Sequence, residues 1–137
     1  MKIKVDIDKT AIQSAIEEAI SEKIMSGNGD GTNMHLTKDQ DFLICQIYKM
    51  YLQSVKSGNS KVDSKRFSSD FYLKSDKLAK WNKQDLMMTL RELGVKNLVH
   101  IYVGGSFYIT DEGIYYMENR FKNGLDEVTD FIAKFIP

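Results

Sequence analysis

Two runs of β-forming residues surround a pair of glycines in the C-terminal half of the chain, and this pattern constrains the fold most. The runs are residues 98–103 and 106–109, with Gly104 and Gly105 between them. Glycine adopts the positive φ angles that a tight two-residue turn needs, so the pattern predicts an antiparallel β-hairpin. The Thr-Asp-Glu-Gly sequence at 110–113 then opens a further helix, which we expect to end at Gly124.

A strongly apolar helix is predicted well before the hairpin. Thr37 and Gln40 have the spacing of a capping box, in which each side chain satisfies a free backbone N–H of the other residue. Apolar residues cover so much of the helix that follows, through Val55, that we expect it to be the central, most buried one. Cys45 lies within it and is therefore interpreted as a core residue rather than a nucleophile.

Two more helices are predicted between this helix and the hairpin. A short one contains residues 65–67. The other begins at Asn82, whose side chain is a good N-cap, or earlier near Asp76, and it ends at Gly94 in a left-handed cap. Its buried face is a stripe of three leucines, Leu86, Leu90 and Leu93.

The fold class predicted from these elements is α+β, mainly helical, in one structural unit of three parts. Residues 1–33 form a strand-like arm, an amphipathic helix and a Gly-rich hinge, 34–122 form the central domain, and 123–137 form a C-terminal amphipathic helix. The apolar stripes of the two terminal helices are Ile12, Ile16, Ile20 and Ile24, and Leu125, Val128, Ile132 and Phe135. Each stripe needs a partner surface, which is either a second copy in a homodimer or the rest of the same chain.

Charge is distributed unevenly along a chain whose net charge is zero. Residues 56–83 carry eight Lys or Arg against three Asp, a net charge of +5, and both ends of the chain are acidic. A basic middle is a possible electrostatic footprint for a polyanion, and it is equally typical of a solvated surface.

Several functional classes are disfavoured by composition. The single cysteine allows no intramolecular disulfide and indicates a reducing compartment, so we expect a cytoplasmic protein. No apolar run approaches the roughly 20 residues that span a membrane. The sequence contains no metal-ligand cluster, no phosphate-binding loop and no base beside Cys45, so we expect no metal, no cofactor and no enzymatic activity.

The order of these elements resembles the winged helix-turn-helix superfamily. The resemblance is carried by Leu-Arg-Glu-Leu-Gly-Val at 90–95 and Phe-Tyr-Ile-Thr-Asp-Glu-Gly-Ile-Tyr-Tyr at 107–116. In the family pattern the third helix runs into the first strand of the wing, and the second strand ends in an aromatic-x-aliphatic-Thr-x-x-Gly helix start. The resemblance covers about residues 37–121, within the central domain 34–122. The chain is similar to MarR- and PadR-type regulators and to small winged-helix proteins of Gram-positive bacteria and their prophages.

The resemblance implies a dimeric transcriptional regulator that binds double-stranded DNA, with the third helix in the major groove. Asp85 and Glu92 fall on the exposed face of that helix and would repel phosphates. The candidate phosphate contacts are Lys65, Arg66, Lys77, Lys80 and Lys83, and the candidate base readers are Gln84 and Arg91.

The wing departs from the DNA-binding pattern, because its tip and both of its strands lack Lys and Arg. The alternative is therefore a non-enzymatic protein–protein interaction module, an accessory or prophage-encoded factor that uses the neutral wing and a terminal helix. A third interpretation is a small-ligand sensor with an apolar pocket at the dimer interface.

Most aromatic residues are predicted to be core, but Tyr72, Tyr102 and Tyr108 could stack on single-stranded bases.

Overall fold

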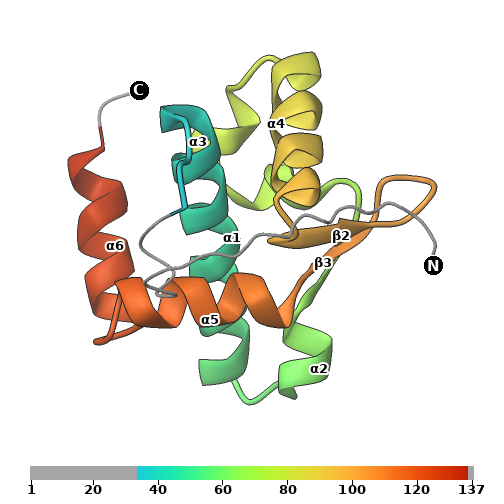
Figure 1. Cartoon of the computed structure of the whole chain (residues 1–137). Helices are drawn as coiled ribbons and strands as arrows, with labels where there is room; N and C mark the ends of the chain where they lie inside the picture. Colours follow the sequence, from blue (N-terminus) through green and yellow to red (C-terminus); the bar gives the residue numbers. More distant parts are fainter. Residues whose placement is uncertain (1–33, 136–137) are drawn as a thin grey trace, which may run out of the picture. The chain divides into compact units, whose positions relative to one another are not determined.

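Helix α1, Lys38–Lys56, lies at the centre of residues 34–135, the part of the chain that the computed structural model describes (Figure 1). The capping box is confirmed: Thr37 Oγ1 accepts from the Gln40 N–H at 3.2 Å, and Gln40 Oε1 accepts from the Thr37 N–H at 3.1 Å. Nine residues of α1 are buried, more than in any other described helix, as the apolar pattern predicted. The arm, helix and hinge predicted within 1–33 lie outside the described residues.

The segment after α1 corrects one prediction. Residues 65–67 do not form a short helix: α2 spans Lys61–Ser64, and Arg66–Phe67 form the strand β1. The hydroxyl of Ser60 caps the start of α2 by accepting from the Asp63 N–H, and Lys65 is the C-cap residue that separates the helix from the strand. The ring of Phe67 stacks on that of Phe107 at 5.0 Å, so a distant aromatic contact favours the extended backbone.

Three helical elements follow in close succession: η2 (Phe71–Lys74), α3 (Asp76–Ala79) and α4 (Lys83–Val95). Asn82 caps α4, because its Oδ1 accepts from the Asp85 N–H at 3.0 Å. The predicted start at Asn82 is thus confirmed, and the alternative earlier start corresponds to the separate helix α3. The predicted stripe is buried, namely Leu86, Leu90 and Leu93.

The predicted glycine cap of α4 is wrong. Gly94 lies inside the helix, which continues to Val95. Asn97 takes the left-handed conformation instead, with φ of 65°. Asparagine is one of the few residues other than glycine that adopt this conformation readily, and the Asn97 N–H donates to the Gly94 carbonyl at 3.0 Å.

The sheet has three antiparallel strands in the order β1-β3-β2, where β2 is Val99–Ile101 and β3 is Phe107–Ile109. The predicted hairpin is therefore confirmed. Gly104 and Gly105 have φ angles of 101° and 98°, as the turn requires. The Tyr102 N–H donates to the carbonyl oxygen of Ser106 at 2.8 Å. The loop therefore contains three residues, 103–105, rather than two residues.

Helix α5, Asp111–Arg120, starts against residues 97–98, which directly precede β2. Thr110 caps it by accepting from the Gly113 N–H at 2.9 Å, and the Thr110 hydroxyl donates to the Asn97 carbonyl at 2.6 Å. A Cβ at Gly113 would collide with the carbonyl oxygen of Leu98. The glycine of the Thr-Asp-Glu-Gly sequence is therefore needed for the close approach of helix and strand.

Gly124 begins α6 rather than ending α5. Helix α5 ends at Arg120, because Phe121 turns into the core with φ of −121° and ψ of 77°. Gly124, with φ of 67°, directly precedes α6, Leu125–Lys134.

Helix α6 packs along α1 on the side opposite α4 (Figure 1). Val128 and Ile132 are buried, Leu125 is half-buried, and the Phe135 ring lies 4.8 Å from that of Phe42. The stripe of the C-terminal helix therefore packs against the rest of the same chain, which was one of the two partner surfaces predicted for it. The matching stripe of residues 12–24 lies outside the described residues, and the homodimer stays a prediction that light scattering can test. The described residues are α+β and mainly helical, as expected.

Candidate functional site

The outer face of α4 is defined by the residues that this helix does not bury. At 100° per residue, the side opposite the leucine stripe presents four exposed residues. Met88 is 51% exposed and Val95 is 87% exposed, so the centre of this face is apolar. We call the set the α4 outer face: Gln84, Met88, Arg91 and Val95.

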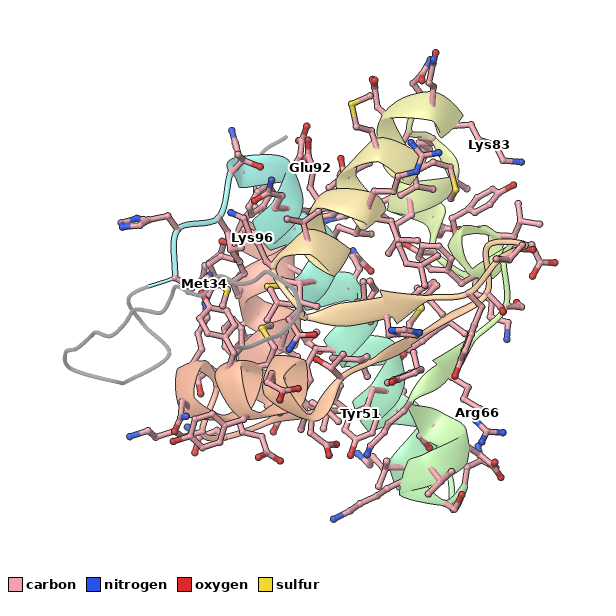
Figure 2. All side chains as sticks on the ribbon, turned by 45° about the vertical axis from the view of Figure 1, so that its right-hand side comes forward. Met34, Tyr51, Arg66, Lys83, Glu92 and Lys96 are labelled. Atoms are coloured by element: carbon pink, nitrogen blue, oxygen red, sulfur yellow. The ribbon has the colours of Figure 1, made fainter. Side chains whose placement is uncertain are left out.

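Two of the predicted lysines adjoin the start of α4. Lys80 is the C-cap residue of α3 and Lys83 is the first residue of α4, and both are exposed. The Lys83 ammonium lies 4.9 Å from the centre of the Tyr72 ring, which gives its long side chain a preferred position. In Figure 2, Lys83 projects away from the body of the protein. Lys80 and Lys83 thus lie within four residues of Gln84, beside one end of the α4 outer face, and we call these two lysines together with that face the α4 cluster.

Lys65 and Arg66 lie elsewhere, at the junction of α2 and β1. Figure 2 places Arg66 well apart from Lys83. The Lys65 ammonium pairs with Asp111 at 2.7 Å, and this hydrogen bond raises the pKa of Lys65. Arg66 is exposed and is paired in the sheet with Tyr108. The structure thus does not join these two residues to the α4 cluster.

Lys77 turns toward α6 instead of toward the α4 outer face. Its ammonium lies 3.4 Å from the carbonyl oxygen of Ile132 and 6.0 Å from the centre of the Phe42 ring. The seven residues predicted to contact DNA are therefore divided among three places, and four of them, Lys80, Lys83, Gln84 and Arg91, remain together.

The two carboxylates expected near the DNA-facing side differ in their surroundings. Glu92 Oε1 accepts from Gln40 Nε2 at 2.9 Å, which directs this carboxylate toward α1. Asp85 is exposed in the first turn of α4, where a negative charge interacts favourably with the helix dipole. Glu92 thus has a structural partner, which the helical period alone did not indicate.

An aromatic cluster covers the outer side of the hairpin. His100 stacks on Tyr108 at 5.2 Å and meets Tyr102 edge-on at 5.1 Å, and Tyr102 and Tyr108 are 5.9 Å apart. Tyr102 is 52% exposed, and Val103 at the tip is fully exposed. Residues 97–109 contain no Lys or Arg. The sequence singled out the two tyrosines, but it missed His100, whose signal is its pairing with Tyr108 across the strands.

The thiol of Cys45 is buried inside α1. Burial raises the pKa of this thiol to about 12, so the thiol is protonated at neutral pH. Among residues 34–135, no group of three or more His, Cys, Asp or Glu is arranged to hold a metal ion. Within the same part of the chain, no helix has the length and apolar character to cross a membrane.

Comparison of the chain with protein-family models, with curated proteins and with solved structures found no match.

Proposed function

We propose that this chain is a winged helix-turn-helix protein that binds double-stranded DNA and regulates transcription, with α4 in the major groove. The order α1, α3, α4, hairpin and α5 agrees with the order that the superfamily resemblance implies. The observation that carries the proposal is the exposed position of Gln84 and Arg91 on the α4 outer face, next to Lys80 and Lys83.

The side chains of this face match the edges of DNA bases. Gln84 can pair with adenine through N6 and N7, and Arg91 can donate two hydrogen bonds to guanine O6 and N7. Met88 and Val95 are exposed apolar groups of the kind that contact the thymine methyl group. These contacts would supply sequence preference, because each is made to a base edge rather than to the backbone.

Lys80 and Lys83 would supply affinity independent of sequence. A lysine that neutralises a phosphate releases a condensed counterion, so each such contact steepens the dependence of affinity on salt. The three cations on and just before this helix, Lys80, Lys83 and Arg91, outnumber its two carboxylates, Asp85 and Glu92. Because Glu92 is held toward Gln40, the balance on the exposed side favours a polyanion.

A salt titration of binding to random duplex DNA, followed by fluorescence anisotropy, tests the proposal. We expect measurable binding at about 50 mM salt, and the Lys80→Gln/Lys83→Gln variant should bind about tenfold more weakly, with a salt slope smaller by about 2. The matched control is Lys122→Gln/Lys134→Gln, which removes two exposed lysines from the α5–α6 side. Undetectable binding of the wild-type chain, or an equal loss in the control, would contradict the proposal.

The aromatic cluster of the hairpin favours a second candidate, a protein–protein interaction module. Exposed tyrosine beside a fully exposed valine is typical of the centre of a protein interface, where aromatic residues are enriched. The absence of Lys and Arg from 97–109 fits this candidate better than insertion of the hairpin into a minor groove. The same titration separates the two, because an interaction module predicts no salt-dependent DNA binding.

A further inference from the structure

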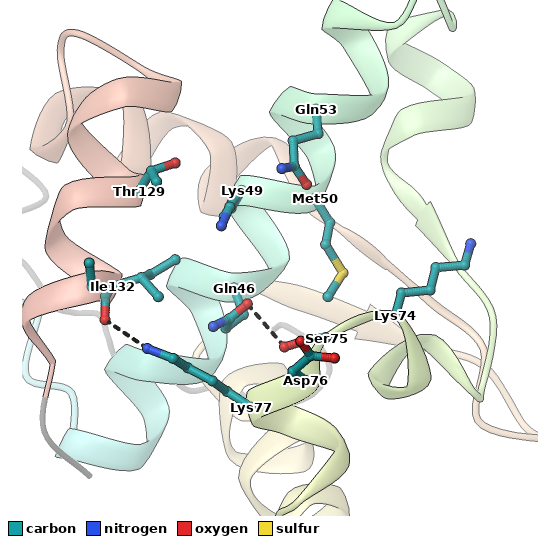
Figure 3. Close-up of a pocket in the computed structure, with 11 residues that line it drawn as sticks. Gln46, Lys49, Met50, Gln53, Lys74, Ser75, Asp76, Lys77, Thr129 and Ile132 are labelled. Atoms are coloured by element: carbon teal, nitrogen blue, oxygen red, sulfur yellow. Dashed lines mark hydrogen bonds between the residues drawn. The ribbon is translucent and has the colours of Figure 1, made fainter.

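A groove of about 370 Å³ runs between α1, α3 and α6, on a part of the molecule that the proposed DNA contacts do not use (Figure 3). Its floor is the exposed edge of α1, one wall is η2 with α3, and the other wall is α6. The lining side chains are mostly polar, and they carry three ammonium groups against the carboxylate of Asp76, while Asp126 and Asp130 of α6 line an adjoining hollow that shares Lys49. This charge balance favours a negatively charged occupant.

Gln46 is the central residue of the groove. Its side chain is only 6% exposed, and its Oε1 accepts from the Ser75 hydroxyl at 3.4 Å. Among residues 34–135, no hydrogen-bond acceptor contacts its Nε2. A buried amide N–H without an acceptor lowers the stability of the fold, so this nitrogen is a donor that a ligand could satisfy.

Two lysines flank the Gln46 amide. Lys49 lies one turn further along α1, and Lys77 reaches across from α3. Figure 3 shows the Gln46 amide between the two ammonium groups, with Thr129 and Ile132 of α6 on the facing wall. Among the described residues, neither ammonium has a carboxylate within 4.0 Å. Lys77 donates only to the Ile132 carbonyl, at 3.4 Å, which leaves other N–H bonds free.

We propose that this groove binds a small anion that presents at least two oxygens, a phosphate or carboxylate group, to Lys49, Lys77 and Gln46 Nε2. Hydrogen bonds from ammonium groups to anionic oxygens are shorter and stronger than neutral ones. The amide donor distinguishes the site from a pair of surface lysines, because it is fixed by burial and by its bond to Ser75. The proposal is independent of DNA binding, since the α4 outer face takes no part in it.

Titration of the full-length ¹⁵N-labelled chain with inorganic phosphate at constant ionic strength tests the site, with succinate as a second arm. We expect saturable NMR shifts of the Gln46 side-chain amide, with a Kd on the order of millimolar. A larger response to phosphate than to succinate identifies the phosphoryl group as the ligand chemistry, and the reverse identifies the carboxylate. Shifts that stay linear to high concentration for both anions would overturn the proposal.

Variants make the test specific. Gln46→Glu keeps the size and the oxygen facing Ser75 but replaces the donor by a negative charge, so it should weaken binding at least tenfold, roughly 1.4 kcal/mol. Lys49→Gln/Lys77→Gln should weaken it comparably, which keeps the test valid if the first variant does not fold. The matched control Lys122→Gln/Lys134→Gln should bind as the wild-type chain does. Wild-type affinity in either groove variant, or an equal loss in the control, would contradict the site.

A DNA measurement separates this proposal from the proposed function. Lys49→Gln/Lys77→Gln should retain DNA affinity within about twofold, because neither lysine adjoins the α4 outer face. If the wild-type chain binds phosphate saturably but no DNA, the groove stands and the DNA proposal fails. If the wild-type chain binds DNA but its NMR shifts rise only linearly with phosphate, the DNA proposal stands and the groove proposal fails.

Discussion

The α4 cluster and the groove between α1, α3 and α6 both contain lysines. One short segment of the chain supplies lysines to each of these two regions. Lys77 belongs to the groove, whereas Lys80 and Lys83, a few residues later, lie at the start of α4. On α4 the cations are exposed and act singly. In the groove they converge on the buried amide of Gln46. A run of charge in the sequence therefore does not define one surface, because the turns of the short helices decide which side chain faces which partner.

The difference has consequences for selectivity. Exposed cations are screened by salt and suit a long polyanion that many weak contacts hold. A buried amide donor between two cations suits a compact ligand that satisfies several donors at once. The two regions should therefore respond independently to mutation.

We expect the largest effect from removing the carboxylate of Asp41, which pairs α1 with α5. Arg120 of α5 makes two hydrogen bonds to the Asp41 carboxylate of α1, one of them at 2.9 Å, and its guanidinium lies over the Phe131 ring at 4.6 Å. Asp41→Ala leaves this largely buried cation unpaired, so the free energy of unfolding should fall by about 2–3 kcal/mol in urea denaturation. Phosphate binding should weaken as well, because α6 follows α5, while DNA binding by the folded chain should not change.

The matched control for Asp41→Ala is Asp39→Ala, which removes an exposed carboxylate from the same first turn of α1. It should cost less than about 1 kcal/mol, the usual value of a charge near a helix N-terminus. Equal losses in the two variants would mean that the Arg120 pair does not hold α5 to α1.

A smaller effect is expected from a charge change on α4. Glu92→Gln keeps an oxygen that can accept from Gln40 but removes a negative charge from α4. Affinity for random duplex DNA should rise about twofold at low salt, a gain that added salt removes. Glu118→Gln on α5 is the control and should change nothing. Unchanged or weaker binding in Glu92→Gln would argue against DNA approaching this helix.

Much of the fold could be predicted because its signals are local. The capping box of Thr37, the Asn82 cap and the Gly104–Gly105 pair each act within a few residues. Both caps and the hairpin are confirmed, although the glycines lie in a loop of three residues rather than two. Strand β1 was missed because two residues carry no periodicity, and its extended form depends on the contact of Phe67 with the distant Phe107. The prediction that Gly94 caps α4 was wrong because Asn97, three residues later, also tolerates positive φ and takes the left-handed conformation instead.

The candidate site could be predicted only in part. Helical periodicity correctly placed Gln84 and Arg91 on the exposed side of α4. It could not show that Lys77 faces α6, because that direction depends on how separate helices pack. The groove around Gln46 is likewise formed by three helices, and no sequence motif marks it.

The most direct test of the central claim is an NMR map of the surface that DNA contacts. Random duplex DNA is added to the ¹⁵N-labelled full chain at low salt, and the backbone amide signals are followed. We expect shifts and line broadening to concentrate in residues 80–95, with smaller changes at the hairpin tip, 103–105. Changes centred on the aromatic cluster of the hairpin or on the groove, or no change at any residue, would contradict it.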